Sequence, residues 1–180
     1  MKNKWFVTNI NKKYFLISGK KTFRCQIGSG GLKNPEKKIE GDKSTPIGNW
    51  RLVTIYYRSD RVLRPKFKNK NVLKIHKITK YCGWCDDVKS NFYNKYIKIN
   101  HVKSSNINYE KFWRDDEAYN IIIVISHNVK PVIKNKGSAI FIHCSFPDDR
   151  NTAGCIAMQK KDLVYLIKNL RHNTSIKVKI

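Results

Sequence analysis

A histidine and a cysteine stand at the two ends of a polar loop, where their chemistry can combine. His143 closes the apolar β-type run Ser138 to His143, and Cys155 follows Gly154 and opens a second apolar segment, with eleven residues between them. A thiol needs a base to become a nucleophile, and imidazole is well suited to that role. A histidine at a strand end and a Gly-Cys pair beyond the loop can bring the two together. If the two residues pair, the protein is a cysteine-dependent acyl-transfer enzyme. Taken on these residues alone, the alternative stays open that Cys155 is a small buried core residue and His143 a hydrogen-bonded core histidine.

Three residues of the loop are candidates for holding the substrate. Acyl transfer through a thioester passes through an oxyanion, and the backbone N–H groups near Gly154 and Cys155 are suitable donors for it. Glycine at position 154 also permits close approach of a substrate. Thr152 either positions the imidazole or a carbonyl oxygen, or is an ordinary loop cap. Arg150 either meets a substrate carboxylate or is a solvated loop charge, so these two assignments stay open.

The elements expected to position these residues are mainly strands. Apolar alternation predicts β-structure along most of the chain, and a 3.6-residue period predicts one helix near the C-terminus. The hairpin turn is expected at Asn11 and Lys12. The predicted strands are Trp5 to Ile10, Lys13 to Ile17, Lys21 to Ile27, Asn49 to Tyr57, Tyr119 to Ser126, Ser138 to His143 and Ser175 to Ile180, and the helix is Lys160 to Leu170. Residues 58–111 show an irregular, basic and aromatic pattern. We therefore predict one mainly β domain over residues 1–180, with few helices.

Composition limits the partners. The chain has 180 residues, a hydrophobic share of 41% and a net charge of +24. The hydrophobic share favours a folded core over disorder. The charge indicates either an anionic partner, such as a wall polymer, a membrane surface or nucleic acid, or a compositional bias toward lysine and asparagine. No helix-turn-helix, RNA-binding or zinc-finger signature is present, so we expect no specific nucleic-acid binding.

The sequence also bears on location. The longest apolar run, Ile121 to Ile125, is far shorter than a membrane span, so no transmembrane segment is expected. Lys2 and Lys4 precede a segment that alternates with polar residues and lacks a small-residue cleavage site, so no signal peptide is visible. A complete, unexported chain would be cytoplasmic.

The other four cysteines suggest a rival site. Cys82 and Cys85 form a C-x-x-C pair, which is compatible with a local disulfide, two free thiols, a redox pair or half of a zinc site. A metal site would need His76 or His101 to complete it, and we expect no metal and no cofactor. Cys25 and Cys144 are expected in the core.

Several ordered motifs together resemble one known family. The segment Glu40 to Gly48, EGDKSTPIG, is followed downstream by GSAIFIHC and by TAGCIAM. This order is similar to the L,D-transpeptidase (YkuD-type) catalytic domain, and within it to the shorter branch with EGD-x-x-TP-x-G and TAGC. The resemblance extends from about Cys25 to Leu170 and takes in Trp84 to Asp87 and the Tyr93-Asn94 pair.

The resemblance implies a β-sandwich-like fold with a groove that holds the cysteine. It also implies activity on peptidoglycan stem peptides, with Cys155 as nucleophile and His143 as general base. The thiol attacks the carbonyl of the third residue, a diamino acid, and expels the terminal D-alanine. An amine of a neighbouring stem or of a lipoprotein then takes the acyl group, or water takes it in a carboxypeptidase. Groove-shaping roles fall to Gly41, Asp42, Thr45, Pro46 and Gly48. Such a function implies the periplasm or cell envelope, and we expect a monomer.

One position departs from the family pattern. Many members carry an arginine two residues after the cysteine, and Ala157 stands there in this chain. A substrate-carboxylate contact is therefore expected to be lost or moved to Arg150 or a lysine. Two functions remain open at this point: a cysteine acyltransferase or hydrolase on wall peptides, and a non-catalytic basic binding module on the same scaffold.

Overall fold

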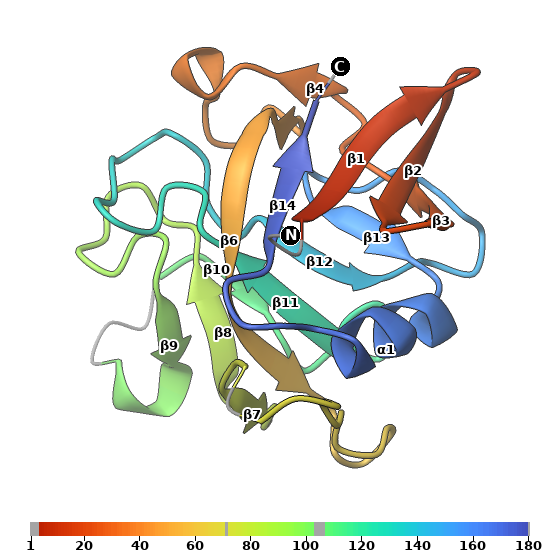
Figure 1. Cartoon of the computed structure of the whole chain (residues 1–180). Helices are drawn as coiled ribbons and strands as arrows, with labels where there is room; N and C mark the ends of the chain where they lie inside the picture. The colour runs from red at the N-terminus through yellow and green to blue at the C-terminus, as the bar shows by residue number, and fades with distance from the viewer. Residues whose placement is uncertain (1–3, 71, 103–106, 180) are drawn as a thin grey trace.

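Strands dominate the computed structural model, which describes residues 4–70, 72–102 and 107–179. Its largest sheet has nine strands, ordered β11 (Ile121–Ile125), β12 (Phe141–Cys144), β13 (Ile156–Met158), β3 (Lys21–Gln26), β2 (Lys13–Ser18), β1 (Lys4–Ile10), β14 (Ser175–Val178), β6 (Gly48–Tyr57) and β7 (Ile75–Lys77) (Figure 1). Two small sheets join β10 (Tyr109–Lys111), β8 (Cys82–Cys85) and β9 (Tyr96–Lys98), and β4 (Leu32–Lys33) with β5 (Thr45–Pro46). The helical elements are α1 (Lys160–Lys168) and the 3₁₀ turns Pro35–Lys37 and Ile99–His101.

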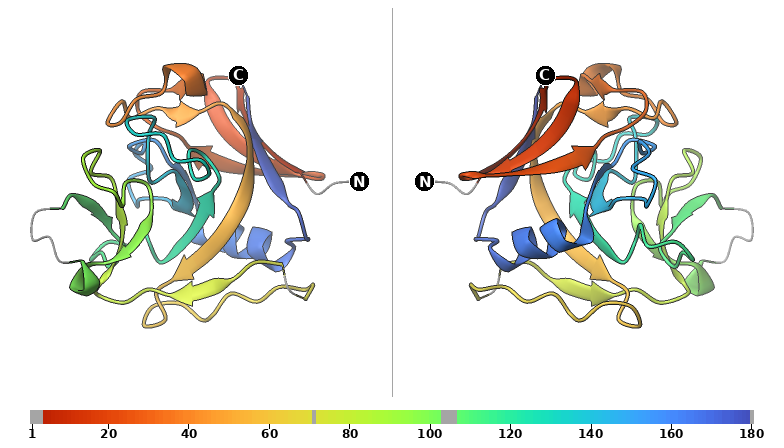
Figure 2. Two further views of the ribbon diagram at one scale, coloured as in Figure 1. Left: turned by 90° about the vertical axis from the view of Figure 1, so that its left-hand side faces the viewer. Right: turned by 90° about the vertical axis from the view of Figure 1, so that its right-hand side faces the viewer.

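The long strand β6 connects the two layers of the fold. Its first residues, 48–51, pair with β14, and residues 52–57 pair with β11. The sheet therefore curves round until its two ends share one strand, and Figure 2 shows the layers facing each other across the interior. The prediction of a mainly β, single-domain fold is confirmed.

Apolar side chains from both layers fill the interior. Ile123, Ile142 and Ile156 are fully buried in one layer, and Val7 and Leu16 are fully buried in the other. Burial of each such side chain contributes roughly 1.5–3 kcal/mol. Leu163, Leu166 and Ile167 of α1 join the same core. The predicted helix is thus confirmed, although it ends at Lys168, two residues earlier than the pattern indicated.

The strands that carry the two candidate reactive residues lie side by side. β12 and β13 run parallel, with His143 opposite Ala157 in the register. A parallel pair needs a crossover connection, and residues 145–155 provide it. Cys155 lies at the end of that connection, immediately before β13, so the sheet register fixes both the histidine and the entry of the cysteine.

The region 58–111 is more regular than its sequence pattern suggested. It contains β7, the three-stranded sheet β10-β8-β9 and a second hydrophobic cluster in which Trp84 and Phe112 pack against Phe141 of β12. The strands here have only three or four residues, which is too short for an alternation to show. This cluster supports β12 from the side opposite the main core.

Candidate active site

His143 and Cys155 line one cavity of about 390 Å³. A larger cavity, of about 600 Å³, lies elsewhere and contains neither residue. The chemistry directs attention to the smaller one. Its lining consists of Lys38, Glu40, Gly41, Lys43, Asp86, Glu110, Arg114, Tyr119, Ser138, Ala139, Ile140, His143, Phe146, Thr152, Ala153 and Cys155.

The His143 imidazole is held in a defined orientation. Its Nδ1 lies 2.8 Å from the carbonyl oxygen of Cys144, an arrangement that assigns the proton to Nδ1 as donor and leaves Nε2 as the basic nitrogen. The ring packs edge-on against Tyr119 and Phe146, with centroid distances of 5.2 and 6.0 Å. The side chain is only 2% exposed, and burial lowers the pKa of His143 to about 4. The imidazole is therefore neutral at pH 7.

The Cys155 thiol packs against the backbone at the start of β12. Its Sγ donates to the carbonyl oxygen of Ala139 at 3.1 Å and accepts from the Phe141 N–H at 3.3 Å. Burial raises the pKa of Cys155 to about 12, and the Phe141 N–H offsets this only in part. A neutral thiol and a neutral imidazole thus share the cavity, so ionisation has to accompany attack on a substrate.

Two threonines fix the loop that carries the nucleophile. Thr152 Oγ1 donates to the Cys155 carbonyl at 2.6 Å and accepts from the Gly154 N–H at 3.1 Å. Thr45 Oγ1 donates to the Gly154 carbonyl at 2.8 Å and accepts from the Gly28 N–H at 2.9 Å. Thr152 thus caps the loop and also positions a carbonyl oxygen, that of Cys155, and its hydroxyl has no hydrogen bond to the His143 imidazole among those of the described residues. Thr45 therefore holds the Gly154–Cys155 peptide group, and Thr152 holds the peptide groups on either side of it.

The backbone conformation at position 154 explains why a glycine occupies it. Its φ of 134° is one that L-residues rarely adopt, and a Cβ there would stand 3.0 Å from the Ser44 carbonyl oxygen. The close approach lets the segment 41–45 lie directly against the nucleophile loop.

Asp42 organises the segment before Thr45. It accepts from Lys38 Nζ at 2.6 Å and from both the N–H and the hydroxyl of Ser44. Its side chain is 5% exposed and that of Lys38 is 3% exposed. Burial by itself raises the pKa of Asp42, but the hydrogen bonds from Lys38, Ser44 and Ile39 outweigh it and hold the pKa well below its usual range. Asp42 supports the cavity wall from behind.

The remaining motif residues differ in their relation to the cavity. Gly41 lines it, next to Glu40 and Lys43. The Pro46 carbonyl accepts from the Trp50 indole N–H at 3.1 Å, and a Cβ on Gly48 would collide with the Trp50 ring. Pro46 and Gly48 are absent from the cavity lining and shape the start of β6 instead.

Arg150 and Ala157 also lie apart from the cavity lining. The Arg150 side chain is 58% exposed, pairs with Asp148 at 3.3 Å and lies over the Phe146 ring. Ala157 is fully buried in β13. The arginine that does line the cavity is Arg114, which pairs with Asp116 and Glu110. Reasoning from the sequence did not single it out.

Three carboxyl groups in the same cavity were also not predicted as site residues. Glu40, Asp86 and Glu110 line it, in a chain that has only 13 acidic residues against 37 basic ones. Burial, together with nearby Glu110, raises the pKa of Asp86 to about 6. Glu40 accepts a hydrogen bond from the Tyr93 hydroxyl. The scarcity of acids in the sequence is the one signal that would have drawn attention to them.

The cysteines outside the cavity lining are buried free thiols. Cys82 and Cys85 form no disulfide, and Cys82 Sγ lies 3.1 Å from the Tyr96 hydroxyl. Cys25 and Cys144 belong to the main core, as predicted. Within residues 4–70, 72–102 and 107–179, no group of three or more His, Cys, Asp or Glu side chains is placed to hold a metal ion. In the same residues, no helix is long and apolar enough to cross a bilayer.

Fold and cavity together define a mainly β protein with a buried cysteine and histidine in one cleft. The chain belongs to the YkuD family of L,D-transpeptidase catalytic domains, whose sequence model matches residues 3–180. This match is longer than the stretch 25–170 over which the motifs were noted.

Among solved structures, the chain is similar to L,D-transpeptidase 1 of Mycobacterium tuberculosis, with 8% identity and a TM-score of 0.42. The similarity covers 98% of this chain and 61% of that one, so the chain spans less than two thirds of the solved protein's length. Similarity this distant says nothing about activity. Among curated proteins, none matches this chain closely enough to count as a relative.

Proposed function

We propose that the chain is a cysteine acyltransferase of the L,D-transpeptidase type that acts on peptidoglycan stem peptides. The observation that carries the proposal is the shared cavity: in a member of this family, a buried cysteine and a neutral histidine line one cleft, with the histidine's Nδ1 fixed by a backbone carbonyl. A substrate of this kind implies a location in the cell envelope.

The geometry supports the following sequence of steps. A substrate carbonyl enters beside Cys155, and His143 Nε2 takes the thiol proton as Sγ forms a bond to the carbonyl carbon. The amide C–N bond breaks, the imidazolium gives its proton to the departing amine of D-alanine, and a thioester remains on Cys155. An acceptor amine then attacks the thioester, transfers its proton to the imidazole and releases the thiol. Water as acceptor gives a carboxypeptidase by the same steps.

The oxyanion of each tetrahedral intermediate needs a backbone donor. The Gly154 N–H already donates to Thr152 Oγ1, so we assign the role to the Cys155 N–H. Thr45 holds the peptide group that contains this N–H and Thr152 holds the next one, so the donor is pre-oriented and needs less reorganisation during reaction.

Charges in the cavity suit a diamino acid. Asp86 is placed to meet an ammonium group, whether on the donor stem or on the acceptor. Lys43 lines the same cavity and is suited to a carboxylate, a contact for which Ala157 leaves no arginine, whereas Arg114 is already paired with Asp116 and Glu110. A cleft with both signs of charge fits a stem peptide, which carries an ammonium group on its diamino acid and a carboxylate on its terminal D-alanine.

The test is an assay of the purified chain on disaccharide tetrapeptides, with product masses read out. We expect loss of D-alanine, with a cross-linked dimer for a transpeptidase or a tripeptide for a carboxypeptidase. Cys155→Ala should abolish turnover, while Cys25→Ala, a control at a buried thiol outside the cavity, should keep it. Incubation with a carbapenem should add its mass to Cys155.

Unchanged turnover by Cys155→Ala would refute the proposal. Absence of turnover and of carbapenem adduct, combined with salt-sensitive binding to sacculi that Cys155→Ala leaves intact, would favour the alternative of a non-catalytic binding module.

A further inference from the structure

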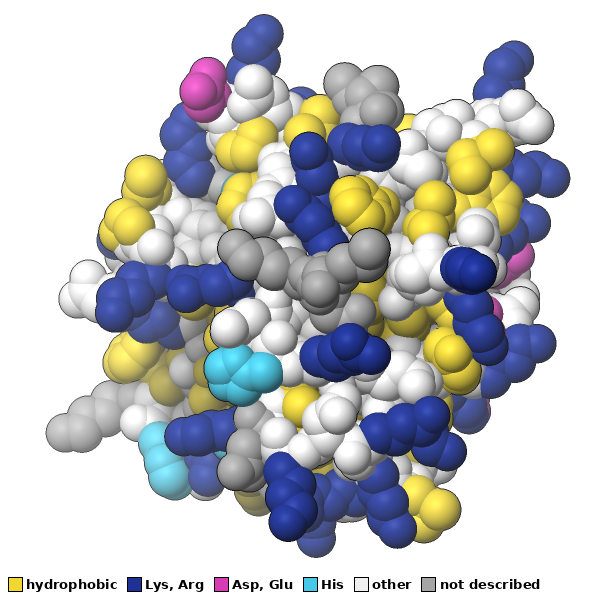
Figure 3. Space-filling model, viewed as in Figure 1, with side chains coloured by type: hydrophobic (Ala, Val, Ile, Leu, Met, Phe, Trp, Pro, Cys, Tyr) yellow, Lys and Arg dark blue, Asp and Glu magenta, His cyan; other side chains and the backbone are white. Residues whose placement is uncertain are grey.

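The charge of the molecule is distributed unevenly over its surface. None of the strands of the nine-stranded sheet contains an aspartate or glutamate, whereas three of the 13 acidic residues line the active-site cavity. Figure 3 shows lysine and arginine side chains spread over the face of the molecule seen in Figure 1, with acidic side chains at its margins. It is therefore the acidic residues that are unevenly placed, and surfaces that lack them carry uncompensated positive charge.

One segment of that surface is unusually basic. Residues 58–77 contain eight lysines and arginines and a single acid, Asp60, which pairs with Arg58 at 2.7 Å. We call the described part of it after Asp60, residues 61–70 and 72–77, the basic edge. Before Lys77 the basic edge has six exposed lysines and arginines. Among the described residues, only one of these six, Arg61, donates a side-chain hydrogen bond, and its acceptors are the carbonyl oxygens of Asp115 and Asp116. The others are available to a partner.

The basic edge also carries an apolar tip. The Leu63 side chain is 94% exposed, and it stands between Arg61 and Arg64. A single exposed leucine is ordinary on a protein surface. An almost fully exposed leucine with arginines on either side in the sequence resembles interfacial membrane-binding segments, in which the apolar group lies among the headgroups and the cations lie at the phosphates.

A groove with an apolar floor adjoins the basic edge. The edge is tied to the end of α1 by hydrogen bonds from the Lys68 N–H to the Lys168 carbonyl and from Asn69 Nδ2 to the Leu170 carbonyl. It then contributes one wall of the 600 Å³ cavity, whose floor includes the buried side chains of Leu52, Val72 and Leu170.

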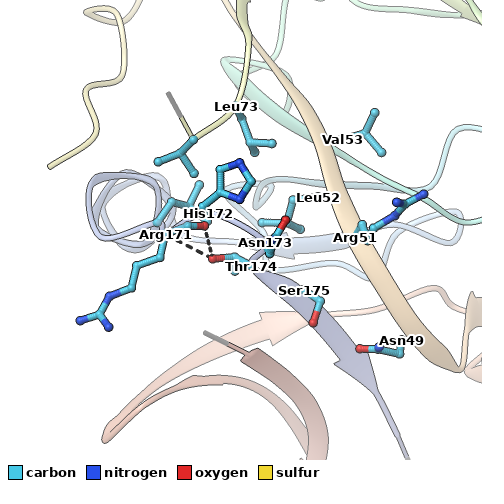
Figure 4. A pocket seen from close by; sticks show the side chains of 12 residues that line it. Asn49, Arg51, Leu52, Val53, Leu73, Arg171, His172, Asn173, Thr174 and Ser175 are labelled. Atoms are coloured by element: carbon cyan, nitrogen blue, oxygen red, sulfur yellow. Dashed lines mark hydrogen bonds between the residues drawn. The ribbon is translucent and has the colours of Figure 1, made fainter. Parts of the chain in front are cut away.

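The rim of this groove is cationic. In Figure 4, Arg51 and Arg171 stand on opposite sides of the groove, with Leu52, Leu73 and His172 between them. No acidic residue is among the described residues that line it. Cations around an apolar depression continue the chemistry of the basic edge.

We propose that the basic edge and the adjoining groove dock the protein on a bilayer that contains anionic phospholipid. Leu63 enters the headgroup layer, and Arg64, Lys66 and the groove-rim arginines contact lipid phosphates. A soluble polyanion would satisfy the cations but would leave the exposed Leu63 side chain in water, so a bilayer fits the surface better. The proposal goes beyond the proposed function and does not depend on it, because it uses neither Cys155 nor His143.

Vesicle co-sedimentation of the full chain tests the proposal. We expect binding to vesicles of phosphatidylcholine with phosphatidylglycerol, little binding to phosphatidylcholine alone, and weaker binding as salt is raised. Since each cation near an anionic surface contributes about a fivefold gain in affinity, Arg64→Glu/Lys66→Glu should weaken binding by at least about 25-fold. Leu63→Ser should weaken it by about tenfold.

Matched controls use exposed residues away from this surface. Lys98→Glu/Lys111→Glu, on the β10-β8-β9 sheet, makes the same change in net charge, and Ile133→Ser removes an apolar side chain that is 55% exposed. Both controls should bind within about threefold of the unmodified chain, since the edge is intact. Cys155→Ala should bind vesicles unchanged, whatever the outcome of the turnover assay.

Three outcomes would overturn the proposal. They are equal binding to neutral and anionic vesicles, equal weakening by the control pair Lys98→Glu/Lys111→Glu, and unchanged vesicle binding by Leu63→Ser. Binding to a soluble polyanion such as polyglutamate without binding to vesicles would likewise reject the bilayer in favour of a polymer.

Discussion

Replacement of Thr45 by valine removes the hydroxyl that ties two distant segments to the nucleophile loop. Thr45 is fully buried, and valine keeps its shape. The change leaves the Gly28 N–H and the Gly154 carbonyl, both buried, without their partner. Each buried group left unsatisfied costs about 1–3 kcal/mol, so the loss of both partners should lower the free energy of unfolding by about 2–6 kcal/mol. At this chain length the melting temperature should fall by about 4–24 °C.

The assay is urea unfolding followed by tryptophan fluorescence, with Thr54→Val as the control. Thr54 Oγ1 donates to the Lys74 carbonyl at 3.1 Å in an exposed setting, where water can replace the bond. The control should therefore lose less than about 1 kcal/mol. Equal losses in the two variants, or a loss below about 0.5 kcal/mol for Thr45→Val, would refute the claim that this hydroxyl holds the loop. The variant should also lose activity, because the Cys155 N–H is no longer pre-oriented.

Three further predictions concern ionisable groups. Because the pKa of Asp42 is held below its usual range, the stability that its carboxylate contributes is fully present above about pH 4 and is lost as the pH falls further. In urea unfolding, Asp42→Asn should lower the free energy of unfolding by about 3 kcal/mol at pH 7, and this difference should shrink in acid. Burial raises the pKa of Cys155 to about 12, so its alkylation by iodoacetamide in the free protein should accelerate about tenfold per pH unit from pH 7 to 9. Peptide mass spectrometry measures the rate, and a plateau near pH 8 would contradict the raised pKa. The pKa of Asp86 is raised to about 6, so its carboxylate becomes protonated as the pH falls from 7 to 5, and KM for a diamino substrate should rise over that range. Asp86→Asn should flatten this pH dependence of KM and leave kcat little changed. A KM that still rises steeply in the variant would count against an ammonium site.

The elements that the sequence predicted well are those whose signals are local. The hairpin of β1 and β2 turns at Asn11 and Lys12, both with positive φ, where the sequence places its turn. The helix was predicted from Leu163, Leu166, Ile167 and Leu170, and all four are buried. These features depend on residues only a few positions apart, so the local sequence pattern is enough to predict them.

The features that escaped prediction depend on contacts between distant residues. Glu40, Asp86 and Glu110 meet in one cavity although tens of residues separate them, and nothing local marks them as a group. Arg150 lies close to Cys155 in the sequence, yet its side chain turns to Asp148 and Phe146. Proximity along the chain was a poor guide to the cavity, because a tertiary arrangement decides which loop side chains enter it.

The five cysteines have a consequence for the handling of the chain. In the folded protein all five thiols are buried and unpaired, and the four outside the active-site cavity are shielded from an oxidising environment. During folding the same thiols are exposed, and an odd number of them cannot all pair within one chain. Slow folding under oxidising conditions would therefore allow non-native disulfides and disulfide-linked dimers to form. The yield of active protein from an oxidising compartment or refolding buffer should therefore depend on how quickly the core closes around its sulfur atoms.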